Sequence, residues 1–215
     1  MINIFKKLLD LIYSKSCYFC SKSDENVLFC SDCRKTVEFL PYEPNKTICG
    51  VPVYAVSYYE NTVKKLIKAV KFHNKSELAQ YQAEIMFEFW KNLDISNKKY
   101  TVIPVPMFYK KEKKRKYNHM NLVGKKFCEL TGYKFDTESL IRNRDTVPQY
   151  KLSVKEREQN LKGAFTLKNT NFSEPLLILD DISTTGATLR EIITILDDNG
   201  ISDIICFVTS VAKYN

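Results

Sequence analysis

The hydrophobic positions of this chain alternate between short unbroken runs and longer stretches with helical spacing. Four runs are apolar for most of their length, which predicts buried strands, because a strand covered on both faces shows no polar alternation. The stretches between them carry apolar residues every three or four positions and predict amphipathic helices. The predicted strands are residues 51–59, 101–106, 176–179 and 204–212, and the predicted helices are residues 62–73, 76–90, 118–130 and one that ends at residue 198.

This order of strands and helices indicates an α/β doubly wound domain. Parallel strands joined by right-handed helical crossovers give this alternation, so we expect a mostly parallel sheet. Ser76 is expected to cap the second helix, and Gly132 and Gly200 follow the third and fourth helices as stop signals. In such a domain a ligand binds at the carboxyl ends of the strands.

The first 45 residues are expected to form a separate small domain. Apolar residues at helical spacing in residues 1–13 predict a short helix, and the segment lacks the long apolar core of a membrane span or signal peptide. A helix lying on a membrane surface is the alternative. Pro41, Pro44 and Asn45 mark a linker, so the predicted domains are residues 1–45 and 46–215.

Two C-x₂-C pairs in this small domain have the spacing of a metal site. The pairs are Cys17–Cys20 and Cys30–Cys33, and nine residues, expected to form a hairpin, separate them. Two such turns complete a tetrahedral Zn²⁺ site that has no open position, which predicts structural zinc. Basic residues nearby are expected to offset its net charge of about −2: Lys15, Lys22, Arg34 and Lys35. The alternative is four thiols without metal.

The most informative motif follows the apolar run at residues 176–179. Two carboxylates, Asp180 and Asp181, precede a loop of small and hydroxyl residues at 183–188, and then a helix begins. Free backbone N–H groups and the positive end of the helix dipole bind anions at such a place, and Gly186 allows close approach. Paired carboxylates can accept hydrogen bonds from the vicinal hydroxyls of a sugar. The motif therefore predicts a phosphorylated ribose as ligand, with a capped strand–loop–helix turn as the structural alternative.

This segment resembles the motif with which type I phosphoribosyltransferases bind phosphoribosyl pyrophosphate (PRPP). The resemblance implies that Asp180 and Asp181 hold the ribose hydroxyls and that Mg²⁺ accompanies the pyrophosphate. It also implies a loop that holds the 5′-phosphate: Ser183, Thr184, Thr185, Gly186, Ala187 and Thr188.

Charge adds a second candidate interface. The formal net charge of +8 and the sequence pI of about 9.0 favour polyanionic partners. A basic run follows the strand at residues 101–106, at the same edge of the sheet as the acid pair. Its cations can neutralise phosphates, and an aromatic residue can stack on an unpaired base. The run comprises Lys110, Lys111, Lys113, Lys114, Arg115, Lys116 and Tyr117; a solvated surface is the alternative.

The order of these motifs is similar to that of the ComF family of competence proteins, which have a phosphoribosyltransferase-like domain. Residues 104–106 (P-V-P) and 115–119 (R-K-Y-N-H) correspond to the family signature P-V-P…R-G-F-N-Q, with Lys116 in place of glycine and His119 in place of glutamine. The four-cysteine site is shared, whereas Cys49 stands alone where many relatives carry a further pair. A third stretch also matches, in the region that forms a hood over the active site of type I phosphoribosyltransferases: Arg142, Arg144, Thr146, Gln149, Leu152, Arg157, Asn160, Gly163, Ala164 and Phe165.

The resemblance implies a cytoplasmic competence protein that binds single-stranded DNA and PRPP·Mg²⁺ during DNA uptake, together with other uptake proteins. The rival interpretation is a nucleotide-salvage phosphoribosyltransferase, although no base-reading set of residues is recognisable. A third is a regulator that only senses PRPP. The hood arginines Arg142, Arg144 and Arg157 either close on pyrophosphate or form surface salt bridges. His73 and His119 are expected to be partly exposed structural residues.

Overall fold

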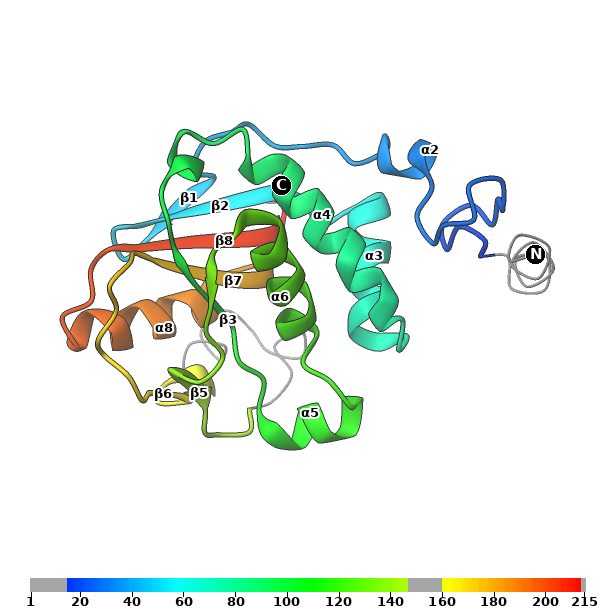
Figure 1. Cartoon of the computed structure of the whole chain (residues 1–215). Coiled ribbons are helices and arrows are strands. Elements are labelled where there is room, and N and C mark those ends of the chain that lie inside the picture. The colour runs from blue at the N-terminus through cyan, green and yellow to red at the C-terminus, as the bar shows by residue number, and fades with distance from the viewer. Residues whose placement is uncertain (1–14, 147–159, 214–215) are drawn as a thin grey trace, which may run out of the picture. The chain divides into compact units, whose positions relative to one another are not determined.

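The computed structural model describes residues 15–146 and 160–213, which form two compact units (Figure 1). We call Met1–Glu38 the cysteine unit and Phe39–Asn215 the sheet unit. Residues 39–45 run beside a strand of the sheet unit, because the Leu40 amide donates to the Val56 carbonyl and the Asn45 amide to the Val53 carbonyl, both at 2.9 Å. The domain boundary at residue 45 stays a prediction.

The described part of the cysteine unit contains little regular structure. Its one described helix is α2 (Ser31–Arg34), and turns connect the two cysteine pairs. The residues between Cys20 and Cys30 form turns and no strands, so the prediction of a β-hairpin there is wrong. The chain does fold back there, since the Tyr18 amide donates to the Leu28 carbonyl at 2.9 Å. Phe29, which is 1% exposed, packs on Phe19 with ring centroids 4.4 Å apart.

The sheet unit is built on a six-stranded sheet in the order β1-β2-β8-β7-β3-β4 (Figure 1). β1 pairs antiparallel with β2, and all other neighbours are parallel, which confirms the predicted mostly parallel α/β sheet. The strands are β1 (Lys46–Ile48), β2 (Val51–Tyr58), β3 (Thr101–Pro104), β4 (Lys134–Phe135), β7 (Leu176–Ser183) and β8 (Ile204–Val211). The short strands β1 and β4 were not predicted, because two or three residues are too few to show a period.

Helices cover both faces of this sheet, as its unbroken apolar strands require. Successive residues of a strand point to opposite faces. In β8, Cys206 and Val208 belong to the apolar cluster that includes Leu189 of α8, whereas Phe207 contacts Trp90 on the other face at 5.0 Å between ring centroids. The helices are α3 (Asn61–Phe72), α4 (Ala79–Trp90), α5 (Tyr109–Arg115), α6 (His119–Thr131) and α8 (Ala187–Asp198), with 3₁₀ turns at Ser76–Leu78 and Asp94–Asn97.

Two local predictions are wrong. Ser76 does not cap α4, because it begins a 3₁₀ turn that leads into the helix, and no side chain caps either start. Residues 110–116, expected to be a loop, form α5 up to Arg115, since lysine, arginine and glutamate favour helix and the segment contains neither glycine nor proline. The stop at Gly132 is confirmed, because this residue ends α6 in the left-handed conformation at φ 71°.

A second, two-stranded sheet follows in the region that resembles a hood. β5 (Leu140–Arg142) pairs antiparallel with β6 (Phe165–Leu167). The segment between them includes residues 147–159, so Gln149, Leu152 and Arg157 lie outside the described residues. Leu140 and Phe165 are buried in the same cluster as the inner face of α8.

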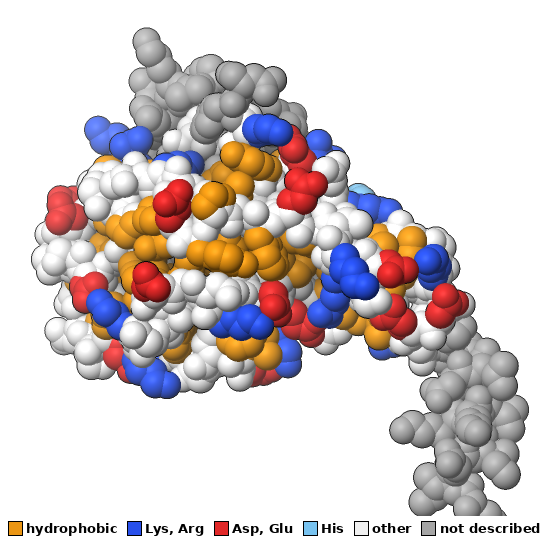
Figure 2. Space-filling view, turned by 90° about the horizontal axis from the view of Figure 1, so that it is seen from above, with side chains coloured by type: hydrophobic (Ala, Val, Ile, Leu, Met, Phe, Trp, Pro, Cys, Tyr) orange, Lys and Arg blue, Asp and Glu red, His pale blue; other side chains and the backbone are white. Residues whose placement is uncertain are grey.

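Figure 2 shows one face of the molecule, on which apolar side chains form a band between scattered Lys, Arg, Asp and Glu. Charges of both signs are interspersed there, so the positive net charge is not gathered on the visible part of this face. Among the described helices, none combines the length and the apolar character that a membrane crossing needs.

Candidate functional sites

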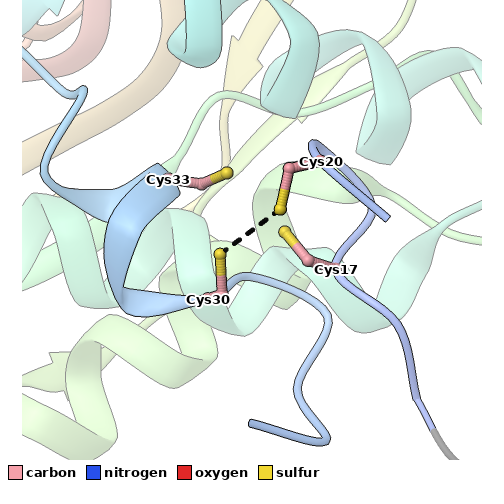
Figure 3. A group of neighbouring side chains, drawn as sticks. All are labelled: Cys17, Cys20, Cys30 and Cys33. Atoms are coloured by element: carbon pink, nitrogen blue, oxygen red, sulfur yellow. Dashed lines mark hydrogen bonds between the residues drawn. The ribbon is translucent and has the colours of Figure 1, made fainter. Parts of the chain in front are cut away.

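The four cysteines of the predicted metal site converge in the cysteine unit. The sulfur atoms of Cys17, Cys20, Cys30 and Cys33 all lie within 4.8 Å of one another, and those of Cys20 and Cys30 are 3.6 Å apart (Figure 3). Four sulfurs bound to one zinc at about 2.3 Å would lie about 3.8 Å apart. The cluster therefore fits a tetrahedral zinc ion and leaves no position for a substrate, which makes the zinc structural.

The acidity of these thiols differs from one to the next. Burial would raise the pKa of Cys17, but the backbone N–H groups of Cys30, Cys20 and Phe19 donate to its sulfur and bring the pKa down to about 6. Burial and the neighbouring sulfurs raise the pKa of Cys33. Like charges this close oppose each other, so full ionisation of the cluster requires a cation.

The acid pair lies at the carboxyl end of β7, where the parallel strands predicted it. Both side chains are buried, with Asp180 9% and Asp181 3% exposed. Because neighbouring residues of a strand face opposite ways, Asp180 turns toward the loop that opens α8, and Asp181 turns toward α3 and α6. The Asp181 amide donates to Oδ1 of Asp180 at 2.8 Å.

A small open pocket lies beside the loop that follows the acid pair. Gly186 opens α8 at φ +81°, and a β-carbon there would lie 2.5 Å from Cδ1 of Ile48, so the position suits glycine alone. The Ser183 hydroxyl is buried and has no partner among the described residues. The pocket is lined by Asp180, Ile182, Ser183, Thr184, Gly186, Ala187, Thr188 and Leu189.

Six of the eight predicted PRPP-binding residues thus line one pocket. The two others are Asp181, which faces the opposite side of the sheet, and Thr185, whose hydroxyl accepts a hydrogen bond from the Ala187 amide at 3.4 Å. Sequence reasoning missed Lys46 of β1, whose ammonium donates to the Thr184 carbonyl at 3.1 Å. It lies far from the motif in sequence, and no local pattern marks it.

Two side chains that sequence reasoning did not assign to the site hold Asp181. Its Oδ2 accepts from the Lys71 ammonium at 2.6 Å and lies 2.8 Å from Nε2 of His119. The other ring nitrogen of His119, Nδ1, lies 3.0 Å from the Arg115 guanidinium. Because arginine can only donate, Nδ1 accepts and Nε2 carries the proton that is donated to Asp181.

These contacts divide the charge of the acid pair unequally. Burial opposes ionisation of Asp181, but the nearby Lys71 and the bond from His119 outweigh it and hold the pKa of that carboxyl well below its usual range. Burial and the charge of Asp181 raise the pKa of Asp180 to about 7. Burial also lowers the pKa of His119, which keeps the ring neutral. Near neutral pH the pair therefore carries between one and two negative charges.

Helix α5 exposes only part of the predicted DNA-binding set. The ammonium of Lys111 donates to the Thr146 carbonyl at 2.6 Å and pairs with Asp145 at 3.0 Å. Arg115 is turned inward toward His119, and the Tyr117 hydroxyl donates to the Val70 carbonyl at 2.7 Å. Four of the predicted residues are exposed: Lys110, Lys113, Lys114 and Lys116.

Lys116 occupies a backbone position that favours glycine. It ends α5 in the left-handed conformation at φ 72°. The glycine of the signature that this segment resembles would adopt it without strain, so the substitution of lysine changes the side chain and not the course of the turn.

Two exposed aromatic rings lie beside these cations. Phe72, at the end of α3, is 59% exposed and lies 5.6 Å from the Arg115 guanidinium, and Tyr109 at the start of α5 is 62% exposed. Sequence reasoning proposed Tyr117 as the stacking residue and missed both rings. Phe72 could have been found from its position at the end of α3 and outside the apolar face of this helix, because an aromatic side chain there does not pack into the core.

The described hood arginines make local contacts. Arg144 donates to the carbonyls of Asn160 and Lys162 at 3.0 and 2.6 Å. Arg142 donates to the Thr146 hydroxyl and lies over the ring of Phe165, and its Nε atom is buried without a partner in residues 15–146 and 160–213. Whether they also close on pyrophosphate stays a prediction.

Comparisons with known proteins agree with this description. A family model described as a double zinc ribbon domain matches residues 8–63. The cysteines in that range are the four of the cluster and Cys49, so the second ribbon lacks a full ligand set. The protein therefore belongs to a class in which a four-cysteine zinc module precedes a mostly parallel α/β domain.

Two curated proteins are similar to this chain. The chain is 29% identical over 153 residues to the DNA utilization protein YhgH of Escherichia coli O6:H1. The match covers 67% of this chain and 65% of that protein, so the chain spans less than two thirds of the length of this relative. It is 26% identical over 203 residues to Competence protein F of Haemophilus influenzae, covering 87% and 86%. The chain is a homologue of both proteins, which confirms the resemblance to the ComF family.

Solved structures give a weaker likeness. A hypoxanthine phosphoribosyltransferase of Staphylococcus aureus matches with 14% identity and a TM-score of 0.37 over 62% of each chain. An adenine phosphoribosyl transferase of Trypanosoma brucei matches with 12% identity and a TM-score of 0.43 over 74% of this chain and 83% of that one. These scores are too low to carry an argument, so the fold rests on the topology described above.

Proposed function

We propose that this protein serves in DNA uptake, where it binds PRPP·Mg²⁺ in the pocket after β7 and single-stranded DNA on the surface of α5. The pocket carries the first half of this proposal. It is lined by a buried hydroxyl that has no partner in the described part of the chain, by a glycine in the left-handed conformation and by the start of a helix. These groups lie beside the carboxylate of Asp180, and a phosphorylated sugar requires this combination of anion-binding groups and a hydrogen-bond acceptor.

The surface of α5 supports the second half. Four exposed lysines and two exposed rings lie on or beside this helix, and single-stranded nucleic acids bind to cations that follow the backbone and to rings that stack on bases. Homologues named for competence and DNA utilization favour nucleic acid over other polyanions. Cytoplasmic location, contacts with other uptake proteins and a role of the cysteine unit in holding the strand belong to the same proposal.

Mg²⁺ would arrive with the pyrophosphate of PRPP. Within residues 15–146 and 160–213, the four cysteines are the one cluster of three or more potential ligands that can share an ion. The proposal therefore assigns no protein ligand to Mg²⁺.

The test is the binding of labelled single-stranded DNA at several salt concentrations, with and without PRPP·Mg²⁺. The Lys113→Ala/Lys114→Ala variant removes two exposed charges from α5. Its slope of log affinity against log salt should be shallower by about 1.4, at about 0.7 for each lost phosphate contact. Arg115 must be left unchanged in this variant, because it contacts His119 and its loss would disturb the acid pair.

The matched control is Lys98→Ala/Lys99→Ala. These two exposed lysines precede β3, at the amino edge of the sheet, and their removal makes the same change in net charge. An equal change of slope in both variants, or no binding of the wild-type protein at low salt, would contradict the proposed surface. Release of pyrophosphate with one free base and not with others would favour the rival phosphoribosyltransferase.

A further inference from the structure

The two carboxylates at the end of β7 each have one oxygen engaged by the protein itself. Oδ1 of Asp180 accepts from the Asp181 amide, and Oδ2 of Asp181 accepts from Lys71 and His119. No described residue donates to Oδ2 of Asp180 or to Oδ1 of Asp181. Neither atom is among the buried side-chain atoms without a partner in residues 15–146 and 160–213, so the described residues leave both open to a ligand.

The unengaged oxygens match what a ribose offers. The two side chains leave opposite faces of β7, but both come after Leu179, the last residue of β7 that pairs with β3, so β3 does not cover the edge of the strand beside them. A cis-diol at this edge carries two O–H donors, and the acid pair keeps one acceptor on each carboxylate. A carboxylate that rotated freely about its χ2 bond would lose entropy on binding the diol. The two bonds to Oδ2 of Asp181 remove this freedom before the ligand arrives, because they come from two different helices, α3 and α6.

We propose that Lys71 and His119 are positioning residues of the ribose site, which engage Oδ2 of Asp181 and thereby present its Oδ1, together with Oδ2 of Asp180, to the two ribose hydroxyls. This inference rests on the phosphoribose pocket proposed above. Arg115 takes part indirectly, because its bond to Nδ1 fixes the tautomer in which His119 donates.

The replacement of glutamine by histidine in the signature is consistent with this role. A glutamine amide also has an N–H₂ group that can donate to Asp181 and an oxygen that can accept from arginine. Residue 119 therefore needs to offer a donor on one side and an acceptor on the other, and both side chains do. A leucine has the size but neither group.

The first test compares three variants by calorimetric titration with PRPP·Mg²⁺. His119→Leu should weaken binding by about tenfold, which is the value of one hydrogen bond to a charged group, while His119→Gln stays close to wild type. Lys71→Met should weaken binding to a similar extent, and Lys68→Met, which removes an exposed lysine from the same helix, is the matched control. Emission of Trp90, the only tryptophan and fully buried, reports whether each variant folds.

The second test needs no ligand. NMR titration of ¹³C-labelled carboxyl groups should show that Lys71→Met moves the ionisation of the acid pair to higher pH, because the pair loses its nearest cation, and that Lys68→Met does not. The charged and titratable groups around the pair are Lys71, His119, Arg115, Arg142, Cys206 and Tyr59. The other five are unchanged in both variants.

The outcomes separate the two proposals. If the wild-type protein does not bind PRPP, the proposed function fails, and the carboxyl titration still tests whether Lys71 holds Asp181. Equal affinities of His119→Leu and His119→Gln, or equal titrations of Lys71→Met and Lys68→Met, would overturn the positioning role.

Discussion

The protein gathers acidic groups in two places and neutralises them in different ways. In the cysteine unit, four thiols lie within 4.8 Å of one another, and the nearby Lys22 pairs with the carboxylate of Asp32 at 3.1 Å. At the end of β7, two carboxylates lie side by side, and the chain supplies Lys71 and His119 to one of them. One cluster requires a cation from solution, whereas the other has a resident cation and keeps free oxygens for a ligand.

This difference separates a structural site from the proposed binding site. Four thiolates around one zinc use every ligand and leave nothing for a substrate. The acid pair is only partly satisfied, and the pKa of Asp180, raised to about 7 by burial and by Asp181, shows the electrostatic cost that remains. Incomplete neutralisation of buried charge is typical of functional sites.

The largest expected effect comes from removing zinc. A structural zinc site contributes about 10–16 kcal/mol of binding free energy, and the described part of the cysteine unit has few buried apolar residues to replace it. Chelation, or Cys17→Ser, should therefore unfold the cysteine unit. Zinc content by mass spectrometry and proteolysis within residues 15–38 measure the loss.

Trp90 provides the control for this experiment. It lies in the sheet unit and is 1% exposed, so its emission should not change when zinc is removed. A red shift of that emission on chelation would mean that the two units unfold together and that the contrast between them is wrong.

The next largest effect is expected for Asp181→Ala. The substitution leaves the Lys71 ammonium and the buried His119 ring without their shared acceptor. Removing one partner of a buried ion pair costs about 3–5 kcal/mol. Chemical denaturation followed by Trp90 emission measures the loss, and Asp145→Ala, which removes the exposed partner of Lys111, is the control with little expected effect.

The two clusters also differ in how well the sequence predicts them. A zinc ion imposes its geometry on two short turns, so the spacing of Cys17, Cys20, Cys30 and Cys33 is visible in the sequence, and the cluster is confirmed. The acid pair and its loop are also contiguous in the sequence. The parallel strands, and the helices that cover both faces of the sheet, follow from the unbroken apolar runs. All of these features can be predicted because they depend on residues that are close together in the sequence.

The groups that hold Asp181 could not be predicted in this way. Lys71 and His119 lie 110 and 62 residues away in the chain, and only the order of the strands brings them together. Lys71 follows Ile67 by one helical turn and so lies at the border of the apolar face of α3, which is a weak signal for a buried lysine. The helix α5 was missed because its charge was given more weight than its helix propensity.

Asp180→Asn is expected to have a smaller effect that depends on pH. The pKa of Asp180 is raised from its ordinary value of 3.8 to about 7 in the folded protein, so between these values the folded state holds a proton that the unfolded state has lost. Stability therefore falls as the pH rises through this window, by up to about 1.4 kcal/mol per pH unit. Asparagine removes this fall and keeps the oxygen that accepts from the Asp181 amide.

Melting curves at pH 5, 6, 7 and 8 measure this difference. The melting temperature of the variant should rise relative to that of the wild-type protein by about 3–5 °C per pH unit at most between pH 5 and 7. Between pH 7 and 8 the difference should change little, because the folded wild-type protein has then also lost the proton. Asp181 does not confuse the result, because its lowered pKa places its own titration below this range, and the group is present in both proteins. Parallel melting temperatures across the range would mean that Asp180 ionises normally.

The smallest effect is expected for Lys22→Ala, and it sharpens the comparison most directly. If zinc alone neutralises the thiolates, the removal of an exposed lysine that pairs with Asp32 should change neither the zinc content nor the competition with a chelator. Lys71→Met, the corresponding change at the acid pair, should by contrast shift the titration of both carboxylates. A clear loss of zinc affinity in Lys22→Ala would show that the chain supplies part of the charge at both clusters, and the distinction between them would become one of degree.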